Sequence, residues 1–345
     1  MDHLPPRVKL TIAPKHLAIV ILPVLVVTLS ESLLSIFADT SVSLDPLSLI
    51  PDMQLTELVG RYRFLAVFFF YAAVCLAIFA LFAAELLSRH SRKSILRVIL
   101  GLVALIVFSF LFSMVEPEWM GSFEAYELLG ASLFEEGLRA GGSPLCDVGG
   151  CDDKGAFFTM RFLMGATNIL SAFAVPAVIL GMIVALSRPG DIDLTTPKGV
   201  LAEGRTLQTA RAAVRRYLYL SGALLSAGMM LGYAWMMWPA ELLADPEQSA
   251  QYQSLVQSIS LYRGVSYTVL ILSFYMPVSL IQMVRIERFH DAAHREDMEV
   301  ITEQAEALEI DKIQTLDALK AILSILAPIL AAAVGSFVGI DALAF

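Results

Sequence analysis

Charged residues are scarce in this chain, and their scarcity excludes an ordinary soluble protein. Only 17% of the 345 residues are Asp, Glu, Lys or Arg, whereas 57% are hydrophobic. The mean hydropathy is +0.70. A soluble domain has about 25% charged residues and a smaller apolar share. The composition therefore predicts an integral membrane protein, with the lipid bilayer as its first partner.

Side chains that perform chemistry are also missing from the long apolar stretches. All five histidines lie outside them, so bis-histidine haem ligation and a Ser-His dyad lack their imidazole. The pair His290 and His294 is interpreted as solvated. No Asp lies in the first six stretches, and no glycine-rich phosphate motif or nucleic-acid signature is present. We therefore expect no enzyme activity, no cofactor, no metal site and no nucleic acid partner.

Seven stretches are long and apolar enough to cross a membrane as helices, because a bilayer core of about 30 Å requires about 20 apolar residues. They are residues 17–38, 64–84, 98–115, 162–187, 217–240, 264–284 and 321–340. We predict an all-α, polytopic transmembrane helical bundle with six spans and a seventh, C-terminal membrane helix. The six-span domain covers 1–284 and includes an outer loop at 116–161. A cytoplasmic helical extension over 285–320 and a membrane-embedded helix over 321–345 follow.

The distribution of Lys and Arg predicts the orientation, since these residues stay on the cytoplasmic side of a membrane. A cytoplasmic N-terminus places eighteen of the 24 Lys and Arg residues inside and six outside. Trp119, Trp235 and Trp238 then fall at the outer ends of spans, where an aromatic belt is expected. The expectation is a multi-pass protein of the inner (plasma) membrane with its N-terminus in the cytoplasm.

Glu31 is the one ionisable residue within the first six spans, and such a residue is a functional hypothesis by default. Two interpretations compete: a cation or proton site facing a wet cavity, and a structural ion pair with an arginine near the same outer level. The arginines in question are Arg63, Arg161 and Arg263. Two other polar residues, Asn168 and Gln282, would either line a cavity or bond neighbouring helices.

The outer loop combines two cysteines with a row of acidic side chains. Cys146 and Cys151 frame the sequence CDVGGC, which predicts a disulfide in an oxidising compartment, with two free thiols as the alternative. Residues 122–138 have apolar positions at helical spacing and glutamates on the other side. That acidic face would either concentrate cations at an entrance or keep the loop solvated.

The C-terminal part lacks helix breakers and then ends in small residues. No Gly or Pro occurs from 278 to 327, which predicts that the sixth helix continues into the cytoplasm. Apolar residues over 298–319 form two short coiled-coil-like stripes that would suit a cytoplasmic protein partner. In the last stretch, small residues recur every four positions and predict a contact with a neighbouring subunit or within the bundle. They are Ala327, Ala331, Gly335 and Gly339.

Two function classes agree with these features. The first is an oligomeric, channel-like membrane protein, a homo-oligomer with an acidic outer mouth and a cytoplasmic helical collar. The alternative is a non-conducting, membrane-anchored interaction or signalling subunit. A continuous water-wide path that reaches Glu31 would favour the channel, and a dry bundle would favour the alternative.

Overall fold

The computed structural model describes residues 10–37, 54–119, 156–190, 192–238, 243, 245–293 and 315–337. Its long helices are α2 (Ile21–Phe37), α3 (Gln54–Arg89), α4 (Arg92–Trp119), α8 (Ala156–Val184), α9 (Pro197–Met237), α10 (Pro246–Ala293) and α12 (Thr315–Phe337). A short α1 (Pro14–Leu17) and the 3-10 turn η1 (Ala18–Val20) lead into α2. Seven helical segments are long and apolar enough to span a membrane. The prediction of an all-α, multi-pass membrane bundle is confirmed.

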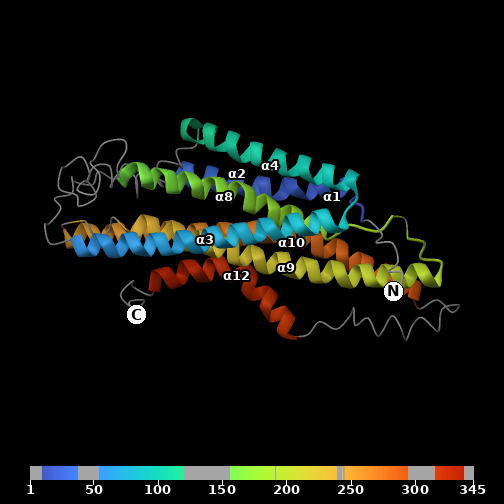
Figure 1. Ribbon diagram of the computed structural model, residues 1–345. Coiled ribbons are helices and arrows are strands. Elements are labelled where there is room, and N and C mark those ends of the chain that lie inside the picture. The colour runs from blue at the N-terminus through green and yellow to red at the C-terminus, as the bar shows by residue number, and fades with distance from the viewer. Residues whose placement is uncertain are drawn as a thin grey trace, which may run out of the picture.

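Helices α9 and α10 form the centre of the bundle (Figure 1). Helix α9 packs on α3, α8, α10 and α12, while α2 packs on α10 and α4 packs on α8. At 1.5 Å per residue, α9 and α10 are about 60 and 70 Å long, twice the thickness of a bilayer core. Both therefore extend well beyond the membrane, and α10 continues past residue 284 to Ala293 as predicted.

Residues 188–216, which lie between the apolar stretches 162–187 and 217–240, are largely helical. Thr196 caps α9 by accepting a hydrogen bond from the Gly199 backbone N–H at 3.2 Å, and Pro197 occupies the first helical position. The basic first half of α9 then packs against the last turns of α10 through Val200, Leu207 and Phe289. A second, smaller core thus lies beyond the main one, at the end of the α9–α10 pair.

The tryptophans at the C-terminal end of α9 face the protein rather than the lipid. Trp235 and Trp238 are 4% and 3% exposed and pack on Phe64 of α3, with ring centroids 5.3 and 5.6 Å apart. Gly60 makes room for them, since a Cβ there would lie 2.5 Å from the Trp238 ring. The prediction that Trp235 and Trp238 belong to a lipid-facing aromatic belt is therefore wrong. Both residues do lie near the end of a membrane helix, as expected.

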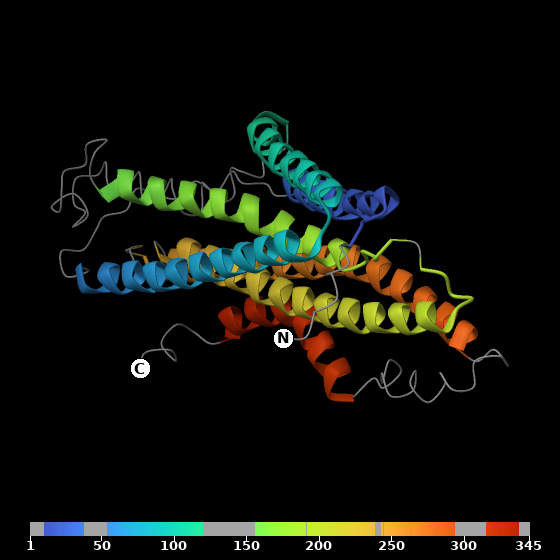
Figure 2. The same cartoon turned by 45° about the vertical axis from the view of Figure 1, so that its right-hand side comes forward.

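Helix α12 packs inside its own chain, against α9 and α10. A Cβ at Gly222 would lie 2.5 Å from the Ser324 carbonyl oxygen, and one at Gly264 would lie 2.9 Å from Ala332 Cβ. Close backbone approach of this kind needs small residues, as in other membrane helix pairs. Both ribbon views show α12 bent (Figures 1 and 2), and it contains Pro328, which removes a backbone donor.

Candidate functional site

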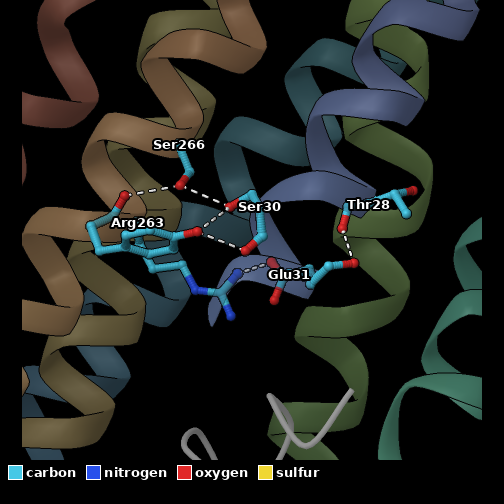
Figure 3. A network of polar contacts seen from close by, with 7 residues as sticks. Thr28, Ser30, Glu31, Arg263 and Ser266 are labelled. Atoms are coloured by element: carbon cyan, nitrogen blue, oxygen red, sulfur yellow. Dashed lines mark hydrogen bonds and ion pairs between the residues drawn. The ribbon is translucent and has the colours of Figure 1, made fainter. Parts of the chain in front are cut away.

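The polar network around Glu31 joins α2 to α10 (Figure 3). Arg263 forms an ion pair with Glu31 Oε1, and the two side chains are 17% and 12% exposed. Arg263 is one of the three arginines considered from the sequence, and its ion pair with Glu31 agrees with the structural interpretation. The positive charge of Arg263 thus compensates the negative charge of Glu31.

Hydroxyl groups next to the ion pair complete the link between the helices. The Tyr262 hydroxyl donates to the Ser30 carbonyl oxygen at 2.7 Å, and the Ser30 hydroxyl donates to Ser266 Oγ at 2.8 Å. Ser266 in turn donates to the Tyr262 carbonyl oxygen at 3.0 Å. Thr28 bonds the Val24 carbonyl of its own helix instead. The network therefore fixes the register of α2 on α10.

One oxygen of this carboxylate stays unused. Glu31 Oε2 is buried and has no hydrogen-bond partner among the described residues. A carboxylate oxygen accepts hydrogen bonds or coordinates a cation, so chemically this atom has room for one more donor. The described residues contain no group of three or more His, Cys, Asp or Glu side chains that could hold a metal ion.

The other residues predicted for this site lie elsewhere. Arg63 is half-buried on α3, and Arg161 belongs to α8, but its side chain is outside the described residues. Asn168 is exposed on α8. Gln282 is buried on α10 at 8% exposure, nineteen positions beyond Arg263 and close to the opposite end of the apolar segment. Gln282 is therefore separated from the Glu31–Arg263 pair by most of the apolar segment of α10.

A second ion pair lies at the other end of the bundle and is more deeply buried. Arg285 of α10 donates from Nε and Nη2 to Glu203 Oε1 at 3.1 and 2.9 Å, and both side chains are 4% exposed. Its Nη1 donates to the Leu186 carbonyl oxygen at 3.3 Å. Arg188 approaches Glu203 Oε1 to 3.6 Å. This cluster ties α9, α10 and the end of α8 together.

Two neighbouring arginines of α9 extend the charged layer. Arg215 pairs with Asp317 at the start of α12, and Arg216 pairs with Glu85 of α3 at 2.5 Å. Tyr217 also donates to Glu85 Oε2, at 3.1 Å. These arginines are 37% and 43% exposed, so water screens them more than Arg285. Ion pairs thus join α9 near this end to α10, α3 and α12.

Sequence reasoning missed Glu203 and Arg285, although the sequence contains a signal for each. Glu203 is the only acidic residue between Lys198 and Arg216, amid five basic ones. Arg285 immediately follows the apolar stretch 264–284. A lone acid within a basic helix suggests a buried partner, because a surface position would not need the opposite charge.

The N-terminal segment is held by backbone hydrogen bonds at the same end. Leu10 N donates to the Arg89 carbonyl at 3.0 Å, and Thr11 exchanges bonds of 2.7 and 2.9 Å with Arg188. His90, in the turn between α3 and α4, is 3% exposed, and neither ring nitrogen has a partner among the described residues. Burial holds the pKa of His90 below its ordinary value of 6.5.

The structure describes only part of the predicted subunit contact. Ala327 and Ala331 are half-buried on α12, Gly335 belongs to the same helix, and Gly339 lies outside the described residues. The face that meets α9 and α10 is the adjacent one, which contains Ser324, Pro328 and Ala332. The contact with a second subunit stays a prediction.

Three further predictions concern segments that the structure leaves undescribed. Cys146 and Cys151 lie outside the described residues, as does the acidic helix expected at 122–138. Most of the coiled-coil-like stripe over 298–319 is also outside them. Comparison with protein-family models, with curated proteins and with solved structures finds no match to this chain.

Proposed function

We propose that this protein is a non-conducting, membrane-anchored subunit that binds and couples other proteins. The observation that carries the proposal is the pairing of Glu31 with Arg263, two residues 232 positions apart in sequence. A carboxylate that guides cations must present an uncompensated charge to water. Here an arginine from α10 compensates it, and hydroxyl groups occupy the neighbouring positions.

The packing of the central helices supports the same proposal. Between α8, α9 and α10 lies a cavity of about 10 Å³, and Ser221 is the only polar residue among those lining it. That volume is at the lower limit for a single water molecule. Ion conduction through one bundle needs a continuous polar path, and this small, mainly apolar cavity between α8, α9 and α10 does not provide one, which supports a structural role for this contact.

The length and anchoring of α10 suggest how coupling would work. Arg263 and Arg285 lie 22 residues apart, about 33 Å along the helix. One is paired to α2 and the other to α9, so α10 is fixed at both ends of its apolar segment. A helix held in this way transmits displacement between the two sides of a membrane. The extension 285–320 would then be the docking segment for a cytoplasmic protein partner.

A channel built by several subunits is the second candidate, and Asn168 favours it. This amide is exposed on α8 within an apolar segment, where a polar side chain facing lipid is costly. In a homo-oligomer it would face a neighbouring subunit or an aqueous axis. The acidic outer loop would then form the mouth of the pore.

Ion flux into proteoliposomes separates the two candidates. Wild type, Glu31→Gln and Arg263→Gln would be reconstituted at equal density, with native mass spectrometry reporting subunit number. We expect wild-type flux equal to that of empty liposomes, and lower thermal stability for both variants. Flux in the wild type that Glu31→Gln alters, with the subunit number unchanged, would refute the non-conducting proposal.

We further propose an inner-membrane location with the N-terminus in the cytoplasm, on the basis of the Lys and Arg distribution. A single cysteine introduced at Arg205, which is exposed on α9, should resist an impermeant thiol reagent applied to spheroplasts. Rapid labelling of that cysteine in intact spheroplasts would reverse the orientation.

A further inference from the structure

Four exposed cations gather where the N-terminal segment meets the first turns of α4. Ile12 N donates to Ser94 Oγ at 3.2 Å, and Arg97 Nη1 donates to the Ile12 carbonyl at 3.0 Å. These bonds bring the start of α1 to the start of α4, more than 75 positions away in sequence. The exposed cations so collected are Lys15, Arg92, Lys93 and Arg97.

Among the described residues, no acidic side chain is paired with the cations of this patch. The sequence contains no acidic residue between positions 3 and 30 or between 86 and 115. Glu85, the nearest acid before α4, forms ion pairs with Arg89 and Arg216. Within the described segments, no carboxylate forms an ion pair with any of the four cations. Within the described part of the chain, the patch therefore presents four positive charges with no carboxylate paired to them.

An apolar face begins directly beside the charges on both helices. On α4, Leu96 and Leu100 are each 60% exposed and lie one and two turns beyond Arg92 on the same face. On α2, Leu22 and Leu29 continue the face of Lys15 and are 45% and 61% exposed. Figures 1 and 2 show α2 and α4 on the same side of the bundle, opposite α12.

A cation followed by an exposed apolar stripe matches the chemistry of a phospholipid with an anionic headgroup. The phosphate needs positive charge at the membrane boundary, and the acyl chains need apolar surface just inside it. Clusters of four or more Lys and Arg next to a membrane helix attract anionic lipids in this way. We propose that anionic phospholipids bind at this patch, with their headgroups on Lys15, Arg92 and Lys93.

Lipid retention measured by native mass spectrometry tests the proposal. The protein in neutral detergent would be titrated with phosphatidylglycerol and, separately, with phosphatidylcholine. We expect preferential retention of phosphatidylglycerol, and a loss of roughly fivefold in affinity for each cation neutralised. Arg92→Gln with Lys93→Gln should therefore weaken binding by more than tenfold, whereas Arg92→Lys with Lys93→Arg should bind as wild type.

The matched control removes the same charge from another surface. Lys198 and Arg288 are exposed near the tip of the α9–α10 pair, beyond the Glu203–Arg285 cluster. Lys198→Gln with Arg288→Gln should change phosphatidylglycerol binding by less than threefold. Raising NaCl from 0.05 to 0.5 M should also release the lipid from wild type, because salt screens exposed charges. Equal retention of both lipids, or equal losses in both double variants, would overturn the proposal.

Discussion

Replacing Glu203 by Gln should destabilise the protein strongly, because it leaves a buried guanidinium without its counter-charge. Arg285 is 4% exposed, and two of its three hydrogen bonds to described residues go to Glu203 Oε1, at 2.9 and 3.1 Å. Arg188 is 3.6 Å from the same oxygen, so the change also leaves two cations facing each other. Breaking a buried ion pair from one side costs about 3–5 kcal/mol. We expect a loss in that range for Glu203→Gln.

The free energy of unfolding in mixed micelles, followed by circular dichroism, would measure this loss. The matched control is Arg216→Gln, which breaks the ion pair with Glu85. Arg216 is 43% exposed. Because water screens that pair, the control should cost about 1 kcal/mol or less. The double variant Glu203→Met with Arg285→Met removes both charges together and should lie within about 1 kcal/mol of wild type.

The double variant makes the reasoning refutable. If burial of an unpaired charge causes the loss, the double variant must be more stable than Glu203→Gln. A double variant as unstable as the single one would show that packing, rather than charge, is responsible. A loss below about 1 kcal/mol for Glu203→Gln would show that water reaches the pair.

Three other predictions concern single features. Burial lowers the pKa of His90 in the folded protein below 6.5, so the unfolded state binds the proton more readily. The free energy of unfolding should therefore fall as the pH drops through about 6.5. His90→Gln should flatten that part of the pH profile. Gly264→Val should displace α12 and cost about 1–3 kcal/mol of unfolding free energy, while Gly165→Val, with nothing within 4 Å of its Cβ, should be tolerated. Mass spectrometry of unreduced peptides should find Cys146 joined to Cys151 by a disulfide. Complete alkylation of both thiols on intact cells would contradict this prediction.

The helical, membrane-spanning type of the long apolar stretches follows from the sequence because hydropathy is a local, additive property. Each stretch such as 64–84 or 264–284 is apolar enough by itself to require a helix in lipid. The same locality explains why the helical residues before 217 do not follow from hydropathy. The first half of α9 is basic and amphipathic, so its hydropathy resembles that of a loop, and its helix depends on the Thr196 cap and on packing against Phe289.

Pairings between helices were decided only by the tertiary structure. Any of three arginines suited Glu31 by sequence, and the packing of α2 on α10 selected Arg263. The close approaches at Gly222 and Gly264 place α12 on α9 and α10, which small-residue spacing alone could not distinguish from a subunit contact. Span prediction sums the transfer free energies of single residues, whereas a partner depends on the relative position of whole helices. The seven helical segments can therefore be predicted from the sequence. The contacts between them depend on the shape and charge of helices that lie far apart in the sequence.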